Sequence, residues 1–254
     1  MTLRVMTLNV RYDKPDPGDN AWAVRRSSLL HLIRGHLPDV LATQEALPHQ
    51  LVELVVGLPE YAVVGRDRRG NGRGEYCAIF YRRERFECMR HGDFALSETP
   101  GAIGSVTPSW GNILPRIATW ALLRDSETFK RVLVINTHFD HESARARHLS
   151  ATLLKRKAQE LMPDGGAVII AGDFNSTAQD QCRVTLSDGL DDALARVEGD
   201  KVTYVDFEGA PRLSIDTVFF SRDLGLRRAE IDRAAPLEVR PSDHFAVLVD
   251  LEIF

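Results

Sequence analysis

The chain has 254 residues, a hydrophobic content of 44% and a formal net charge of −4. This length allows one large domain or two small ones, and the composition is that of a folded protein and not of a disordered one. The negative charge argues against a dedicated double-helix binder, which normally carries a basic excess. Local basic stretches such as residues 66–69 can still contact phosphates, although a solvated turn is the simpler interpretation.

The three cysteines, Cys77, Cys88 and Cys182, form no CxxC pair. This argues against a disulfide framework and against a structural zinc site. We therefore expect a reducing compartment and a cytoplasmic location. No apolar run approaches the roughly 20 residues that span a bilayer. The first six residues turn polar too soon for a secretory leader, so we expect the first strand there.

Apolar runs predict strands, and helical spacing of apolar residues predicts helices. In chain order, we expect a strand over 3–9, a helix over 22–36 with Asn20 as its cap, a strand over 39–43 and a helix over 48–56. Strands over 61–64, 77–81 and 86–96 follow, then a loop rich in proline and glycine over 97–115. The remaining elements are strands over 117–123 and 132–137, a helix over 145–161, and strands over 167–171, 213–220 and 245–251.

Strands outnumber helices, and they occur both in pairs and in alternation with helices. This order favours sheets packed on one another with helices outside. No repeat or linker divides the chain, so we expect one domain over residues 1–254.

Polar residues recur at the ends of the predicted strands. They are Asn9, Glu45, His138, Asp173, Asn175, Asp243 and His244, with Asp216 inside a strand. Strand ends are rigid, and polar groups placed there can converge at one edge of a sandwich of sheets. Buried acids without partners are costly, and a cation between them lowers that cost.

The types of these side chains indicate a chemistry. Carboxylate and amide oxygens suit Mg²⁺ or Mn²⁺ better than zinc or copper, and bound Mg²⁺ commonly retains waters and phosphate oxygens. His138 and His244 are then candidates for proton transfer near neutral pH. Each needs an orienting carboxylate, for which Asp216 is the candidate beside His244 and Glu75 beside His138.

Each of these residues also has an ordinary interpretation. Asn9 alone is typical of a turn, Glu45 of a helix N-terminus, and His138 of a structural histidine. Gly, Asp and Asn are common turn formers, so neither the turn at 172–175 nor the turn at 242–244 is specific alone. The joint pattern is what favours a site.

Six short stretches, taken in order, resemble the endonuclease/exonuclease/phosphatase superfamily. They are Met6-Thr7-Leu8-Asn9, Thr43-Gln44-Glu45, Asn136-Thr137-His138, Gly172-Asp173-Phe174-Asn175, Ile215-Asp216-Thr217-Val218-Phe219 and Ser242-Asp243-His244. Further stretches, including 74–76, 79–81 and 137–141, are similar to an uncharacterised bacterial branch near the deadenylase-like members. The resemblance implies a four-layer α/β/β/α sandwich of two packed mixed sheets with outer helices. It also implies a phosphoester hydrolase that uses Mg²⁺, with Mn²⁺ as the alternative.

The resemblance assigns a metal-binding part of the site. Glu45 would be the principal Mg²⁺ ligand, and Asn9 and Asp243 would assist at the metal or through its waters. Asp173 would help to activate or hold the attacking water. Asn175 would orient the phosphate.

It also assigns the histidines. His244, paired with Asp216, would act on the attacking water or stabilise the phosphoryl oxygens. His138, with Glu75 behind it, would contact the phosphate or protonate the leaving oxygen. Family members divide base and acid differently among these residues, so not every proton is assigned.

The substrate is left open by the fold. We expect a phosphodiesterase of nuclease or nucleotide type first, with a phosphomonoesterase for a sugar or inositol phosphate as the alternative. An inactive module that binds a phosphate ligand is the third hypothesis. The partner would be a nucleotide, a single-stranded nucleic acid or a small phosphate ester. The expected substrate contacts are Asn20, Arg116, His141 and Arg147, with Trp22 and Trp110 as candidate stacking rings.

Overall fold

The computed structural model describes residues 2–254 of the chain. The strands are β1 (Thr2–Asn9), β2 (Val40–Ala46), β3 (Tyr61–Val64), β4 (Tyr76–Arg82), β5 (Phe86–Ala95), β6 (Ile117–Asp125), β7 (Arg131–His138), β8 (Ala167–Asp173), β9 (Asp191–Asp192), β10 (Tyr204–Val205), β11 (Arg212–Leu213), β12 (Asp216–Phe220), β13 (Leu224–Asp232) and β14 (Ala246–Ile253). The α-helices are α1 (Trp22–His36), α2 (Pro48–Gly57), α3 (Ala144–Leu161) and α4 (Gln181–Ser187). Short 3-10 helices lie at Gly18–Asn20, Pro108–Trp110, Ala193–Arg196 and Pro236–Glu238.

The strands form two six-stranded mixed sheets and the small hairpin β10–β11. The first sheet has the order β13-β14-β1-β2-β4-β3, and the second has the order β5-β6-β7-β8-β12-β9. In the first sheet β1 runs parallel to β2, and in the second β7 runs parallel to β8. The carboxyl ends of parallel neighbours meet at the same edge of a sheet. A hydrogen bond from Asn9, which ends β1, to Asp173, which ends β8, joins these two edges.

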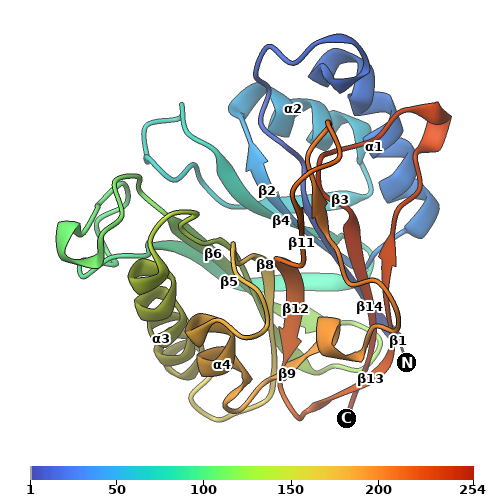
Figure 1. Ribbon diagram of the computed structural model, residues 1–254. Helices are drawn as coiled ribbons and strands as arrows, with labels where there is room; N and C mark the ends of the chain where they lie inside the picture. The colour runs from blue at the N-terminus through green and yellow to red at the C-terminus, as the bar shows by residue number, and fades with distance from the viewer. Residues whose placement is uncertain (1) are drawn as a thin grey trace.

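Three apolar cores separate four layers of secondary structure. The central core lies between the two sheets, where Val5 and Val249 of the first face Val134 and Val218 of the second. A second core packs α3 and α4 on the second sheet, and a third packs α1 and α2 on the first. Figure 1 shows the two helix pairs on opposite sides of the molecule. The four-layer sandwich implied by the resemblance is confirmed. No helix within residues 2–254 is both long and apolar enough to cross a membrane.

Some predicted elements differ from those observed. Helix α1 has its predicted bounds, but Ala21 occupies the cap position and Asn20 does not cap the helix. The predicted strand over 213–220 begins only at Asp216, because Leu213 belongs to the hairpin β10–β11. Helix α4 and strand β13 were not predicted. Helix α4 has only seven residues, too few to display a helical period, and β13 is a charged edge strand with one buried residue.

A bulge in β2 turns Glu45 out of the sheet. The pairing of β2 with β4 is regular from Val40 to Thr43 and is broken before Ala46. Within the break, Glu45 has a φ of 69°. This left-handed conformation costs a residue other than glycine about 1–2 kcal/mol. Bulges re-aim side chains at functional edges of sheets, and Glu45 is aimed at a cavity between the sheet edges.

Asn136 of β7, in the opposite sheet, forms hydrogen bonds with backbone and side-chain groups at this bulge. Its Nδ2 donates to the carbonyl oxygens of Thr43 and Ala78, both at 2.8 Å. Its Oδ1 accepts a hydrogen bond from Nε2 of Gln44 at 2.7 Å. All four residues are fully buried. The bulge is therefore held by a polar contact between the sheets.

Gly172 is required by the close approach of β7 to β8. Its φ is 152°, and a Cβ atom on it would lie 2.1 Å from the carbonyl oxygen of Thr137. Any larger residue would separate the two strands just before His138 and Asp173, which are register partners. The glycine of the Gly-Asp-Phe-Asn turn is therefore fixed by packing.

Replacing Asn136 with leucine should destabilise the protein strongly. The change removes three hydrogen bonds, two of which are donated to buried carbonyl oxygens. We expect the free energy of unfolding, measured by urea denaturation, to fall by about 3 kcal/mol. The control Asn71→Ala alters an exposed loop bond and should change it by no more than about 0.5 kcal/mol. Equal stability of Asn136→Leu and the wild type would contradict this account of the bulge.

Candidate active site

A cavity of about 380 Å³ opens where the edges of the two sheets meet. Its walls combine charged, polar and apolar side chains from strand ends and from the loops that follow them. The lining residues are Arg11, Tyr12, Glu45, Arg68, Glu75, Leu114, Arg116, His138, His141, Asp173, Asn175, Tyr204, Leu213, Ile215, Asp243 and His244. Most of the predicted site residues are therefore brought together in one place.

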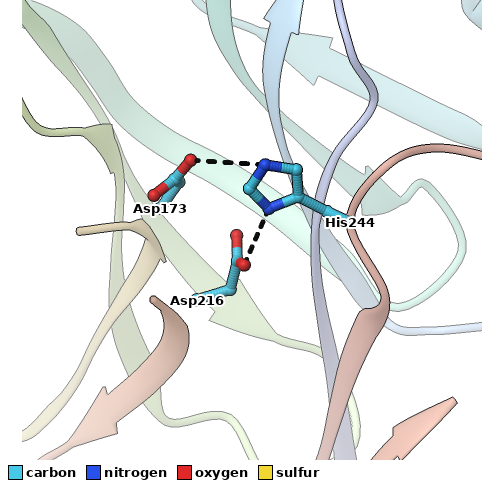
Figure 2. A group of neighbouring side chains, drawn as sticks. All are labelled: Asp173, Asp216 and His244. Atoms are coloured by element: carbon cyan, nitrogen blue, oxygen red, sulfur yellow. Dashed lines mark hydrogen bonds and ion pairs between the residues drawn. The ribbon is translucent and has the colours of Figure 1, made fainter. Parts of the chain in front are cut away.

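His244 lies between two buried carboxylates (Figure 2). Its Nδ1 is 2.8 Å from Oδ2 of Asp216, and its Nε2 is 3.8 Å from Oδ2 of Asp173. Burial disfavours a charged imidazole, but Asp216 and then Asp173 outweigh it and raise the pKa of His244 above its ordinary value. The predicted pairing of His244 with Asp216 is present, and it favours an imidazolium at neutral pH.

Asp173 is held by hydrogen bonds on both oxygens. Its Oδ1 accepts the backbone N–H of Asn175 at 2.9 Å, and its Oδ2 accepts Nδ2 of Asn9 at 3.1 Å. Burial, and then the charge of Asp216, raise the pKa of Asp173, while His244 opposes this rise. Asn175 reaches its place through a left-handed backbone with a φ of 47°.

Asn9 joins Glu45 to Asp173. Its Nδ2 donates to Oε1 of Glu45 at 2.9 Å as well as to Asp173. The second oxygen of Glu45 accepts the backbone N–H of Tyr12 at 3.1 Å. Asn9 is fully buried, and its Oδ1 accepts the backbone N–H of Arg11. Its amide therefore orients the two carboxylates, and its oxygen is engaged by the backbone.

Asp243 enters the cavity beside Glu45. Oδ2 of Asp243 is 3.0 Å from Nη1 of Arg11, and its Oδ1 accepts a hydrogen bond from Ser242. The Ser242 hydroxyl also bonds the carbonyl oxygen of Asn9 at 2.6 Å. Burial raises the pKa of Asp243, and the like charge of Glu45 raises it further. Two carboxylates that repel one another thus face the same space.

His138 meets a different environment from that of His244. Its Nε2 is 3.5 Å from Oδ2 of Asp173, but its surroundings are otherwise cationic. Burial, followed by the charges of Arg116 and Arg68, holds the pKa of His138 well below its ordinary value. The two histidines therefore differ in protonation at neutral pH, with His138 neutral.

Arg116 offers free N–H groups to the cavity. Its side chain is 4% exposed, and Nη2 lies 2.8 Å from Nδ1 of His141. Asp140 is 3.8 Å from its Nε. Its Nε and Nη1 are buried and have no hydrogen-bond partner among residues 2–254. A buried guanidinium with unused donors is suited to bind an anion.

Glu75 does not bond His138 as expected. Its Oε1 accepts Nη2 of Arg68 at 2.5 Å, and this pair lies on the cavity wall. Arg68 is presented by a loop whose backbone N–H groups at Arg69, Gly72 and Gly74 all donate to Asp67. We therefore correct the predicted partner of Glu75 from His138 to Arg68.

Two of the four predicted substrate contacts, Asn20 and Arg147, do not line the cavity. Asn20 is not among its lining residues, and its carbonyl oxygen accepts from Arg25. Arg147 does not line the cavity either, because its Nη1 turns back to the carbonyl oxygen of Asp140 at 3.0 Å.

The tryptophans are not free to stack on a substrate. Trp110 is buried, and its indole N–H bonds Glu98. Trp22 is also buried, and its N–H bonds Glu53. Both rings belong to cores on the outer faces of the sheets.

Sequence reasoning missed several lining residues. Arg11 and Tyr12 follow the end of β1, the same signal that identified Asn9, so position alone would have found them. Arg68 lies in the basic stretch that was interpreted as a solvated turn. Tyr204 and Leu213 come from the hairpin β10–β11, and only the fold brings this hairpin to the cavity, where Tyr204 contacts His244.

The donor set fits a hard divalent cation. Glu45 and Asp243 are carboxylates with like charges on one wall, which is the arrangement that Mg²⁺ or Mn²⁺ stabilises. Asp173, Asp216 and His244 also lie within 4.8 Å of one another. In that group, however, Nδ1 of His244 is already engaged by Asp216, so the group is better suited to hold a proton than a metal.

The chain matches one family model and several solved structures. The model of the Endonuclease/Exonuclease/phosphatase family matches residues 6–244. A comparison with curated proteins finds no match. A protein of that family from Bacteroides vulgatus is 34% identical, with a TM-score of 0.94 and 100% coverage of both chains. A mannosyl-6-phosphatase from Bacteroides thetaiotaomicron is 31% identical, with a TM-score of 0.87 and coverage of 99% of this chain and 100% of that chain.

A more distant structure shares the fold alone. TDP2 from D. rerio, complexed with a single-strand DNA product, is 18% identical, with a TM-score of 0.76 and 99% coverage of both chains. The match of the family model over nearly the whole chain, together with the two Bacteroides structures, decides the classification. This chain belongs to the endonuclease/exonuclease/phosphatase family.

Proposed function

We propose that this chain is a Mg²⁺- or Mn²⁺-dependent phosphomonoesterase that acts on a sugar phosphate. One observation supports the reaction type. A single cavity holds two carboxylates that repel one another, two histidines of different protonation and a buried arginine with unused N–H groups. Together these groups can bind a cation, transfer a proton and bind an anionic phosphate. Hydrolysis of a phosphoester needs all three.

Glu45 and Asp243 would hold the cation, with Asn9 orienting Glu45 from behind. A bound Mg²⁺ or Mn²⁺ neutralises charge on the phosphate and polarises its oxygens. The left-handed backbone of Glu45 fixes its carboxylate at the cavity wall.

Asp173 would accept the proton of the attacking water, and His244 would stabilise the phosphoryl group. Asp173 faces the cavity and is held on both oxygens, so it can orient a water and accept its proton. The His244 imidazolium, fixed by Asp216, would donate a hydrogen bond to a phosphoryl oxygen. Asn175 lies next to them in the cavity lining, and its side-chain amide would orient the phosphate.

Arg116 and His138 would bind the remaining phosphate oxygens. Arg116 supplies two nitrogens, Nε and Nη1, whose N–H groups are unused within residues 2–254, and His141 fixes the third nitrogen of its guanidinium. Because His138 is neutral, it would bind the phosphate as a hydrogen-bond donor and would not supply a proton to the leaving oxygen, which would take its proton from solvent water. This narrows the two roles that the resemblance implied for His138.

The phosphomonoesterase is better supported than the phosphodiesterase of nuclease type. The mannosyl-6-phosphatase is 31% identical over 99% of this chain, whereas the structure with bound DNA product is 18% identical. The cavity lies at the low end of the roughly 300–1,000 Å³ typical of small-ligand sites. Tyr204, Leu213 and Leu114 add apolar surface to its lining, which would contact the organic part of the substrate.

A substrate panel with metal added back tests this proposal. Chelated protein should release no phosphate, and Mg²⁺ or Mn²⁺ should restore release of inorganic phosphate from hexose 6-phosphates. Single-stranded RNA and nucleotide diesters should be cleaved at least ten times more slowly. Faster cleavage of a diester would replace the proposal with the phosphodiesterase, and no hydrolysis of any ester would favour an inactive binding module.

Asp173→Asn and His244→Ala should each lower kcat by at least about 100-fold, because residues that act as one unit are each needed. Circular dichroism should show that both variants remain folded. Leu237→Ala is a matched control, since Leu237 is exposed and lies outside the cavity. Near-wild-type turnover in either site variant would contradict the assignment.

The stability of the metal-free protein should depend on pH through His138. Its pKa in the folded state lies below the unfolded value of about 6.5. As pH falls below about 6.5, the unfolded state binds a proton that the folded state refuses, so stability is lost by up to about 1.4 kcal/mol per pH unit. His138→Gln should remove this loss between pH 6.5 and 5 in urea titrations with chelator present. An unchanged slope would show that His138 is not the group responsible.

A further inference from the structure

Arg25 is a buried arginine in α1 that lies outside the cavity. Its side chain is 0% exposed, and its guanidinium donates to four carbonyl oxygens. Nε bonds Asn20 at 3.1 Å, Nη1 bonds Val10 at 2.5 Å and Pro241 at 3.1 Å, and Nη2 bonds Arg11 at 2.6 Å. One side chain therefore joins α1 to two loops that are distant in sequence.

In the part of the chain that the structure describes, the charge of Arg25 has no ion-pair partner. Within residues 2–254, no carboxylate lies within 4.0 Å of its guanidinium nitrogens. Burial lowers its pKa to about 10, so it stays protonated at neutral pH. The ring of Trp22 lies 5.0 Å from its central carbon. A buried cation is costly unless its donors are satisfied, and here backbone carbonyl oxygens satisfy them.

Both loops held by Arg25 lead into the cavity. Val10 and Arg11 follow the end of β1, and Arg11 has a left-handed φ of 59°. The carbonyl oxygen of Arg11 bonds Arg25, while its guanidinium lines the cavity and pairs with Asp243 at 3.0 Å. Pro241 lies two residues before Asp243 in the other loop.

We propose that Arg25 is a positioning residue that fixes Arg11 and Asp243 in the cavity by clamping the backbones of their loops. The proposal rests on the proposed function, in which Asp243 holds the metal and the cavity binds phosphate. It assigns to Arg25 no contact with the substrate.

The shape of the guanidinium matters as much as its charge. Its planar fork directs N–H groups to carbonyl oxygens in fixed directions, whereas the single ammonium of a lysine cannot reach all four. Arg25→Lys therefore keeps the charge and loses the clamp. It separates an electrostatic role from a geometric one.

Ser28 provides a matched control on the same helix face. It lies one turn after Arg25, is buried, and donates to the carbonyl oxygens of Pro236 and Val239, both at 2.5 Å. Ser28→Ala therefore loosens the same loop at Pro236 and Val239 and leaves the bonds from Arg25 to Pro241 and Arg11 in place. It reports the effect of a general loss of packing between α1 and the loop.

The experiment compares the wild type, Arg25→Lys and Ser28→Ala by three measurements. They are Mn²⁺ affinity by calorimetry, kcat and KM with a hexose 6-phosphate, and hydrogen exchange of residues 9–12 and 240–244. For Arg25→Lys we expect Mn²⁺ affinity and kcat/KM to fall about 10–100-fold, as for residues that orient metal ligands. Exchange in both segments should rise. Ser28→Ala should stay within about twofold of the wild type in all three.

Two results would overturn the proposal. The first is Arg25→Lys with reduced stability but with wild-type Mn²⁺ affinity and wild-type exchange in both segments. The second is Ser28→Ala with losses equal to those of Arg25→Lys. Failure of the proposed function is recognised separately, because it shows as absence of hydrolysis by the wild type. In that case the exchange of the two segments alone decides whether Arg25 clamps them.

Discussion

The bulge at Glu45 is the feature on which the site depends. A regular β2 would keep residue 45 in the ladder with β4, and the left-handed turn there instead brings its carboxylate to the cavity. The conformational free energy of that turn is offset from the opposite sheet, where Asn136 donates hydrogen bonds to the carbonyl oxygens of Thr43 and Ala78. The packing of the two sheets and the placement of Glu45 are thus linked, because the Asn136 amide of one sheet bonds the backbone at the bulge of the other.

The cavity collects charges that would be unfavourable if unpaired. Asp216 is matched by His244, and Arg68 by Glu75. Glu45 and Asp243 repel one another although Arg11 pairs with Asp243, and Arg116 keeps buried nitrogens without acceptors within residues 2–254. A divalent cation suits the first pair, and a phosphate suits the arginine. The charges of the site are therefore suited to bind a divalent cation together with the phosphate of a phosphoester.

Buried arginines support the two turns that carry the site. Arg25 holds the loops that lead to Arg11 and Asp243. Arg183 of α4 plays a similar part behind the other turn, where it bonds the carbonyl oxygen of Ser176 and lies over the ring of Phe174. Both guanidiniums reach several segments at once, which an apolar side chain cannot do. Rigid support of this kind is what a site needs if its groups are to stay in register.

The sequence by itself determined the order of the longer strands and helices other than α4 and β13, and it placed Glu45, His138, Asp173 and His244 at strand ends. It did so because apolar periodicity and turn residues are local signals. Only the tertiary structure decided which side chains these site residues contact. Glu75 bonds Arg68 instead of His138, and Tyr204 reaches His244 from a hairpin without a strong pattern. The different protonation of His138 and His244 was also beyond the sequence. Both are ordinary histidines until burial and unlike neighbours move the pKa of one down and that of the other up.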